Sequence, residues 1–207
     1  MEKVIEKKPT VTLTDRMRAM FKGVIDPIAS FLNRLGLMPN TITILGLVGN
    51  TIGAYFIATG SMTIGGIIVL VMGALDTLDG SMARLRGMPT DFGAFIDSVT
   101  DRYSELVIFG GLLYYYVQQA NWVMALVTYL AACGSVLVSY IRARAASLSM
   151  DTKVGILSRF ERFIVLAPSL VFNIPWLGVS IIALLANVTA VQRILDVRRQ
   201  AHTRNQI

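Results

Sequence analysis

The sequence contains six mostly apolar stretches, each about as long as a helix needs to cross a lipid bilayer. They run from Thr41 to Ala58, Met62 to Arg84, Phe92 to Val117, Trp122 to Ile141, Gly155 to Phe172 and Trp176 to Ile194. A transmembrane helix takes about 20 predominantly apolar residues. The connections between the stretches are short and contain turn-forming residues such as Gly60 and Pro175. We therefore expect an all-α integral membrane protein with six transmembrane helices.

Charged residues are too scarce for a soluble enzyme or a disordered chain. They make up 15% of the 207 residues, and 54% of the residues are hydrophobic, whereas an ordinary soluble domain is about 25% charged. The single cysteine, Cys133, cannot form a disulfide within the chain, and the only histidine, His202, lies in the polar C-terminal tail. These observations disfavour zinc sites and histidine-based triads. We expect the lipid bilayer as a partner, and no nucleic acid.

The chain divides into three regions. Residues 1–38 are expected to form a cytoplasmic N-terminus with an amphipathic helix from Asp15 to Leu37 that lies on the membrane surface. Pro27 should kink this helix or split it in two. Residues 39–200 are expected to form a six-helix transmembrane domain, and residues 201–207 a polar C-terminal tail.

The basic residues predict how the chain is oriented. All of the 19 Lys and Arg residues except Arg102 lie in or beside the segments on one side of the predicted membrane. This is the side on which both termini lie. Because cytoplasmic segments of membrane proteins are enriched in Lys and Arg, we expect both termini to be cytoplasmic and the protein to lie in the cell membrane. In the first stretch, Gly49-x-x-x-Gly53 permits close contact between helices and suggests a homodimer.

Six of the 13 acidic residues lie in or next to the second and third apolar stretches. They are Asp76, Asp79, Asp91, Asp97, Asp101 and Glu105. Carboxylates at membrane depth are costly and usually functional. At 100° per residue, Asp76 and Asp79 share one helix face, and Asp97 and Asp101 share another. Two antiparallel helices joined by a short turn would bring these faces together near the cytoplasmic surface, so we expect a site facing the cytoplasm.

The four aspartates Asp76, Asp79, Asp97 and Asp101 are candidate metal ligands. They cannot all stay ionised in a low-dielectric setting unless cations join them. Oxygen-only ligation selects a hard divalent cation, Mg²⁺, Mn²⁺ or Ca²⁺. Asp91 is expected to cap the third transmembrane helix. Glu105 continues the acidic face by one turn or pairs with a basic residue.

The spacing of the acidic and small residues resembles the signature of the CDP-alcohol phosphotransferase family. All eight signature positions are present: Asp76, Asp79, Gly80, Ala83, Arg84, Gly93, Asp97 and Asp101. The resemblance implies transfer of a phosphatidyl group from CDP-diacylglycerol to a polar alcohol, with release of CMP in phospholipid synthesis. It implies one or two Mg²⁺ or Mn²⁺ ions on the four aspartates, and Asp101 as the catalytic base. The residues it implies at the nucleotide are Asp79, Gly80, Ala83, Arg84, Gly93, Asn40 and Thr43.

A basic segment predicts a phosphorylated acceptor alcohol, since arginine clusters suit phosphate. The sequence from Tyr140 to Ala145 is similar to that of phosphatidylinositol-phosphate synthases, which implies inositol phosphate as the acceptor. The candidate acceptor-phosphate residues are Arg144, Arg162, Arg142, Arg159 and Arg199. Glycerol-3-phosphate, the acceptor of a phosphatidylglycerophosphate synthase, is the alternative.

A small cation transporter is the alternative from another functional class, because acidic stripes also line ion pathways. The acidic positions, however, lie at the cytoplasmic ends of the predicted helices. No comparable polar path leads from them to the far side of the membrane. This favours the enzyme.

Overall fold

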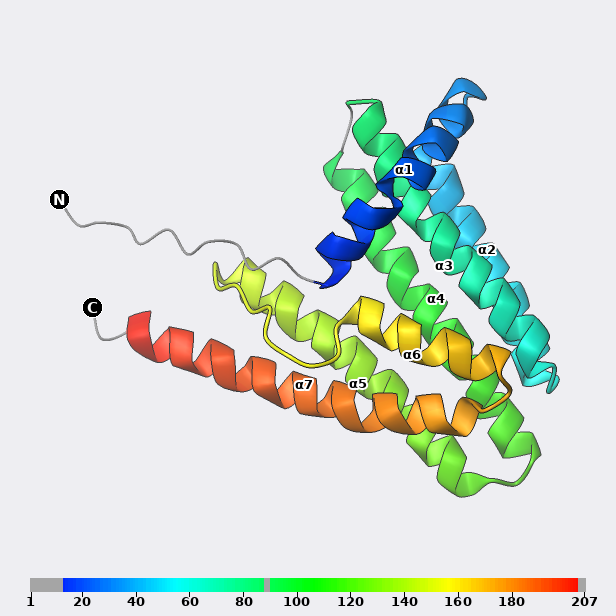
Figure 1. Ribbon diagram of the computed structural model, residues 1–207. Coiled ribbons are helices and arrows are strands. Elements are labelled where there is room, and N and C mark those ends of the chain that lie inside the picture. The colour runs from blue at the N-terminus through cyan, green and yellow to red at the C-terminus, as the bar shows by residue number, and fades with distance from the viewer. Residues whose placement is uncertain (1–12, 88–89, 205–207) are drawn as a thin grey trace.

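The computed structural model describes residues 13–87 and 90–204, and these residues form seven helices and no strands. The helices are α1 (Leu13–Arg34), α2 (Pro39–Ala58), α3 (Met62–Leu85), α4 (Asp91–Gln118), α5 (Trp122–Ser147), α6 (Arg159–Val171) and α7 (Pro175–Arg204), shown in Figure 1. The expected all-α fold is thus confirmed, with a helix at each of the six apolar stretches. The helix α7 continues through Arg204, so most of the predicted polar tail is helical.

The helices of the described ranges differ in how well they suit a membrane. Four of them, α2, α3, α5 and α7, are long and apolar enough to span a bilayer. The helix α4 is continuous over 28 residues, but acidic residues interrupt its apolar sequence, and α6 has only 13 residues. Because about 20 residues are needed to cross the hydrocarbon core, α6 is too short to do so as a regular helix. The chain is a helical membrane protein in which two of the six expected spans are unusual.

The segment before α6 is not helical, although the sequence predicts a helix from Gly155. The backbone N–H groups of Ile156 and Leu157 both donate hydrogen bonds to the Thr189 hydroxyl, at 3.2 and 3.1 Å. Gly155 has φ +127°, a backbone conformation that residues with a side chain rarely adopt. The bonds to α7 hold this segment out of the helix, which begins four residues later, at Arg159.

The bundle has two halves that meet along α4. In one half α2 packs against α3 and α4, and in the other α5 packs against α7 and α4 (Figure 1). The short α6 contacts both α3 and α7. A continuous apolar core runs through the interior and includes Ile57, Phe109, Leu112, Leu170 and Ile182, all almost fully buried.

Glycines allow the closest helix contacts around α2. A Cβ added to Gly65 of α3 would lie 2.7 Å from the carbonyl oxygen of Gly53, and one added to Gly111 of α4 would lie 2.5 Å from that of Ala54. A Cβ on Gly49 would overlap the side chain of Met72 in α3. The Gly49-x-x-x-Gly53 motif therefore packs against α3 of the same chain. It does not support a dimer, and the homodimer stays a prediction.

The described part of α1 docks on the end of α3. Ala29 is fully buried in a small apolar cluster with Leu78 and Met82 of α3 and Ile42 of α2. The Asn33 amide donates to the carbonyl of Met82 at 3.1 Å, and Arg86 donates to the Asn33 side chain at 2.7 Å. Pro27 lies inside α1 without dividing it, so the predicted split is wrong. Residues 1–12 of the predicted N-terminal region lie outside the described residues.

Candidate active site

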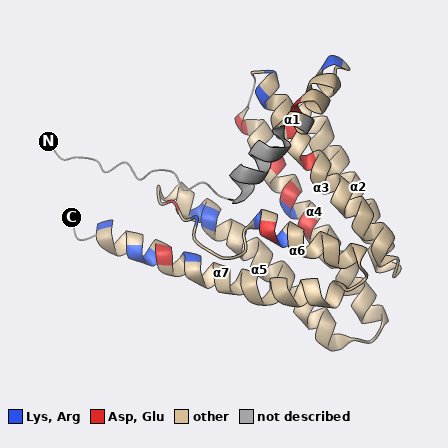
Figure 2. Ribbon diagram, in the orientation of Figure 1, with Lys and Arg blue, Asp and Glu red and all other residues tan. Residues whose placement is uncertain are grey.

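The acidic residues of α3 and α4 lie at one end of the bundle. Figure 2 shows the charged residues collected at this end, while the opposite end of the bundle is uncharged. The chain folds this way because α3 ends in a short connection and α4 returns alongside it. The connection ends at Thr90, whose hydroxyl accepts a hydrogen bond from the Gly93 N–H at 3.0 Å. Thr90 is therefore the cap of α4, and the prediction that Asp91 caps it is wrong.

Among the described residues, three carboxylates meet between α3 and α4. Asp76, Asp97 and Asp101 each offer an oxygen, and these oxygens all lie within 4.8 Å of one another. Asp76 and Asp97 are half-buried, and Asp101 is only 6% exposed. We call these three residues the acidic cluster. Their convergence agrees with the helix-face prediction made from the spacing.

Asp79, the fourth predicted metal ligand, is not part of the acidic cluster in the structure. One of its oxygens accepts a hydrogen bond from the Thr43 hydroxyl at 2.6 Å, and the other accepts one from the Gly80 N–H at 2.5 Å. Thr43 lies in the first turns of α2, so this bond ties α2 to α3. Asp79 is buried and satisfied by these partners.

The acidic cluster has a basic partner, Arg159, which the sequence predicts as an acceptor-phosphate residue and not as an ion-pair partner of the aspartates. The Arg159 guanidinium, at the start of α6, lies 3.1 Å from a carboxylate oxygen of Asp76 and also pairs with Asp101. Arg102 lies 3.6 Å from the second oxygen of Asp101. Part of the negative charge of the cluster is thus balanced within the protein.

Arg162 and Glu105 form a second ion pair one helical turn further along. The guanidinium donates two hydrogen bonds to the carboxylate, at 2.7 and 3.1 Å, and a weak one of 3.4 Å to the Leu157 carbonyl. Arg162 is only 1% exposed. Glu105 therefore pairs with a basic residue, one of the two predicted alternatives. Arg162, predicted to contact the acceptor phosphate, has its guanidinium engaged by this carboxylate.

The predicted nucleotide residues come from α2, α3 and the start of α4. A Cβ added to Gly93 would lie 3.6 Å from the Asn40 side-chain oxygen, so the beginning of α2 borders the beginning of α4. Arg84 donates to the Ser81 hydroxyl at 2.8 Å and is exposed. A Cβ on Gly80 would lie 3.3 Å from the Arg84 guanidinium. At both glycines a side chain would meet a polar neighbour of the predicted nucleotide site, so these positions favour a residue without a side chain.

The other candidate acceptor arginines lie on the surface. Arg142, Arg144 and Arg199 are exposed, and Arg144 donates to the Ser147 hydroxyl at 3.3 Å. Within the described residues, the ion pairs of the acidic cluster involve Arg159 and Arg102 rather than these three. Of the five predicted acceptor residues, Arg159 is in contact with the acidic cluster, through Asp76 and Asp101.

The donor set of the acidic cluster fits a hard divalent cation. It consists of carboxylate oxygens alone, which Mg²⁺ and Mn²⁺ prefer. Asp101 is buried and faces a second carboxylate, and a divalent ion would compensate this arrangement. The fold and the acidic cluster thus define a helical membrane protein with a carboxylate site for a divalent metal.

Comparison with known families identifies this class. Residues 36–193 match the CDP-alcohol phosphatidyltransferase family, and the chain belongs to that family. It is therefore a transferase of phospholipid synthesis, as the signature indicated. The matched region runs from just before α2 into the last turns of α7 and includes every residue of the acidic cluster.

Relatives with described activities cover nearly the whole chain. An archaetidylinositol phosphate synthase of Pyrococcus horikoshii is 33% identical over 189 residues, covering 91% of this chain and 98% of the relative. The crystal structure of Mycobacterium tuberculosis phosphatidylinositol phosphate synthase with CDP-DAG bound is similar, with a TM-score of 0.79 and 31% identity over 84% of this chain and 93% of that one. A second structure of that enzyme, in complex with manganese and citrate, has a TM-score of 0.80 at 31% identity, over 84% of this chain and 88% of that one.

Proposed function

We propose that this protein transfers a phosphatidyl group from CDP-diacylglycerol to inositol phosphate and releases CMP. The observation that carries the proposal is the acidic cluster, three carboxylates from two helices placed beside an arginine and bordered by glycines. The relatives add support, because those with described activities are named for the synthesis of inositol phosphate lipids.

The acidic cluster would hold one or two divalent ions. Asp76, Asp97 and Asp101 supply the oxygens, and Asp79 would join them if it left the Thr43 hydroxyl. A bound Mg²⁺ or Mn²⁺ would stabilise the negative charge of the diphosphate at the scissile bond. The manganese complex of the mycobacterial enzyme supports a divalent ion in this fold.

Asp101 is the proposed general base. It is the most buried carboxylate of the acidic cluster, and it lies where α4 faces the start of α6. Its carboxylate would take the proton from the attacking hydroxyl of the acceptor, a role that needs a carboxylate within hydrogen-bond reach. The chain offers no histidine near the cluster for this task, because its only one is His202.

The nucleotide would lie over the small residues of α3 and α4. Gly80, Ala83 and Gly93 leave space for it, and Arg84 is exposed and able to reach a diphosphate oxygen. Asn40 and Thr43 border the same region from α2. The acyl chains of the donor would stay in the bilayer.

The acceptor phosphate would be bound by arginine. Arg159 is the best placed, because it lies at the acidic cluster and its side chain is 43% exposed. Arg144, Arg142 and Arg199 would contribute from the neighbouring surface of α5 and α7. The proposed role of Arg162 is to hold Glu105 and the start of α6 rather than the phosphate.

We also propose that the six helices α2 to α7 lie in the cell membrane with both termini and the active site on the cytoplasmic side. The support is the charge distribution: residues 35–75, 106–141 and 163–192 contain no Asp, Glu, Lys or Arg. Labelling with an impermeant maleimide tests this topology. In a Cys133→Ala background, a cysteine at Ala120 should react from outside intact cells, and one at His202 should not.

An acceptor screen tests the activity. Purified protein with CDP-diacylglycerol and Mg²⁺ is given inositol phosphate, inositol, glycerol-3-phosphate or serine, and CMP release is measured. Turnover with inositol phosphate alone is expected, and chelation of the metal should stop it. Turnover with glycerol-3-phosphate alone would make the protein a phosphatidylglycerophosphate synthase. The absence of CMP release with every acceptor would contradict the transferase proposal.

A further inference from the structure

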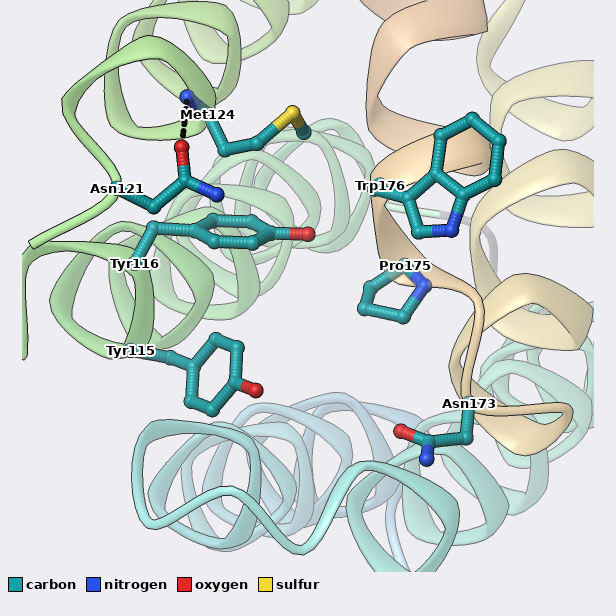
Figure 3. A pocket seen from close by; sticks show the side chains of 7 residues that line it. All are labelled: Tyr115, Tyr116, Asn121, Met124, Asn173, Pro175 and Trp176. Atoms are coloured by element: carbon teal, nitrogen blue, oxygen red, sulfur yellow. Dashed lines mark hydrogen bonds between the residues drawn. The ribbon is translucent and has the colours of Figure 1, made fainter. Parts of the chain in front are cut away.

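A cavity of about 450 Å³ lies at the end of the bundle opposite the acidic cluster (Figure 3). Its wall includes Tyr115 and Tyr116 from the end of α4, Asn121 before α5, and Asn173 and Trp176 around the start of α7. We call it the distal cavity. Tyr116 lies 15 residues after Asp101 along α4, which corresponds to about 22 Å of helix. The distal cavity is thus separate from the proposed active site.

Tyr116 places an unsatisfied polar group in this cavity. The residue is only 5% exposed, and its hydroxyl has no hydrogen-bond partner among the described residues. In Figure 3 the hydroxyl points across the cavity toward Pro175 and Trp176. A buried hydroxyl without a partner is destabilising, and a ligand that pairs with it would remove this cost.

An ordinary membrane-interface role does not account for Tyr116. Tyrosines and tryptophans are enriched at membrane interfaces, where the ring lies among lipids and the polar end reaches water. Trp176, which is 54% exposed, fits that pattern. Tyr116 does not fit it, because its hydroxyl is buried inside the protein and does not reach water. Its neighbour Tyr114, 55% exposed on the same helix, serves as the comparison.

The surroundings of the distal cavity select a neutral ligand. Three sequence stretches pass through this end of the bundle, residues 35–75, 106–141 and 163–192, and they carry no acidic or basic side chain. Figure 2 shows the same end without charge. An ionic group bound here would have no counter-charge from the protein. The polar groups on offer are phenol hydroxyls and the amides of Asn121 and Asn173, which pair well with hydroxyl groups.

The space available exceeds what a water molecule needs. One water needs about 10–15 Å³ of accessible volume, against about 450 Å³ in the distal cavity, which is open to the outside. A second cavity of about 210 Å³ adjoins it, shares Asn173 and extends past Gly60, Ser61 and Thr63. Together the two cavities are lined by residues of the α2–α3, α4–α5 and α6–α7 connections. Their combined volume is large enough for a sugar or glycerol unit.

We propose that the distal cavity binds the neutral, hydroxyl-bearing head group of a membrane lipid, such as a glycosyl group, in the leaflet opposite the active site. Trp176 and Tyr115 supply aromatic faces, and Tyr116 and the two asparagines supply hydrogen bonds. A lipid is the favoured source because the cavity opens at the ends of apolar helices. A free sugar shares the same chemistry, and the experiment separates the two.

The two tryptophans of the chain, Trp122 and Trp176, make a direct test possible. In a Trp122→Phe background, Trp176 is the only tryptophan and reports on the distal cavity. The protein is placed in phosphatidylcholine nanodiscs with increasing monoglucosyl-diacylglycerol, and its emission is measured. A saturating change is expected. Adding Tyr116→Phe should weaken the apparent affinity about fivefold, as for one lost hydrogen bond, and Tyr114→Phe should leave it unchanged.

Control titrations identify the source of the ligand, and an activity measurement shows whether each variant is folded. Phosphatidylglycerol, which is anionic, and free glucose are titrated in the same way, and neither should saturate the signal. CMP release reports whether each variant is folded. If Tyr116→Phe fails to fold, Met124→Phe, which fills the cavity from α5, should abolish the response. An equal response to phosphatidylglycerol, saturation by free glucose, or no effect of these variants would overturn the proposal.

Discussion

Arg159 of α6 and Asp101 of α4 form an ion pair inside the acidic cluster, although 58 positions separate them in the sequence. The same guanidinium lies 3.1 Å from Asp76. The arginine therefore interacts with two of the three carboxylates that would bind a divalent ion. Metal and guanidinium compete for the same oxygens, so metal binding has to weaken or displace this contact.

Replacing Arg159 with Gln should tighten metal binding in the absence of any lipid or acceptor. The glutamine removes the competing positive charge, and we expect the Kd for Mn²⁺, measured by calorimetry or electron paramagnetic resonance, to fall by about 3- to 10-fold, since charge-assisted contacts of this kind are modest in energy. Arg142→Gln is the matched control, because Arg142 is exposed on α5. Weaker binding in the Arg159 variant would show that the arginine supports the metal instead of competing with it.

Asp101→Asn should abolish turnover while leaving the protein folded. The amide cannot accept the proton of the attacking hydroxyl, and general-base catalysis typically contributes 10²- to 10⁴-fold. CMP release should fall by at least about 100-fold, with the melting temperature close to that of the wild type. Asp91→Asn, an exposed position in the first turn of α4, is the control. Near-normal turnover of the Asp101 variant would assign the base to another group.

Glu105→Ala should destabilise the protein strongly. It leaves the guanidinium of Arg162, whose side chain is 2% exposed, buried without its carboxylate. Breaking a buried ion pair on one side costs about 3–5 kcal/mol. Asp151→Asn removes the exposed pair with Lys153, at 3.2 Å, and should cost less than about 1 kcal/mol. Thermal unfolding in detergent compares the two, and equal shifts would argue against a structural role for the buried pair.

Gly111→Ala should lower the stability of the protein by pushing α4 away from α2. The added Cβ would lie 2.5 Å from the backbone carbonyl of Ala54, which cannot move without shifting α2. Overpacking of this kind costs about 1–3 kcal/mol. Gly110→Ala, one residue earlier, meets nothing within 4 Å and should be neutral or slightly stabilising. Equal melting temperatures for the two variants would mean that the helices can adjust at this contact.

The helix positions and the convergence of Asp76, Asp97 and Asp101 could be predicted because both follow from periodicity. Apolar length places a helix, and spacing of three or four residues places side chains on one face. The fourth aspartate, Asp79, follows the same periodicity but is held by Thr43 on another helix. Spacing within α3 carries no information about that partner.

The α6 partners of Asp101 and Glu105 were not identified from the sequence for a related reason, although a signal was present. Asp101 and Glu105 lie four residues apart on α4, and Arg159 and Arg162 lie three apart on α6, so each pair shares one helix face. Matching these two faces would have suggested the pairs. The Thr189 contact that delays the start of α6 could not be found this way, since it depends on where α7 packs.

The brevity of α6 bears on how a water-soluble acceptor reaches the reaction centre. Thirteen residues of helix extend about 20 Å, roughly 10 Å less than the hydrocarbon thickness of a bilayer. The missing length falls at the end where Arg159 stands. In the proposed orientation the regular helix of α6 therefore stops about 10 Å short of the cytoplasmic surface, and the proposed phosphorylated acceptor would approach Asp101 past the non-helical residues that precede Arg159.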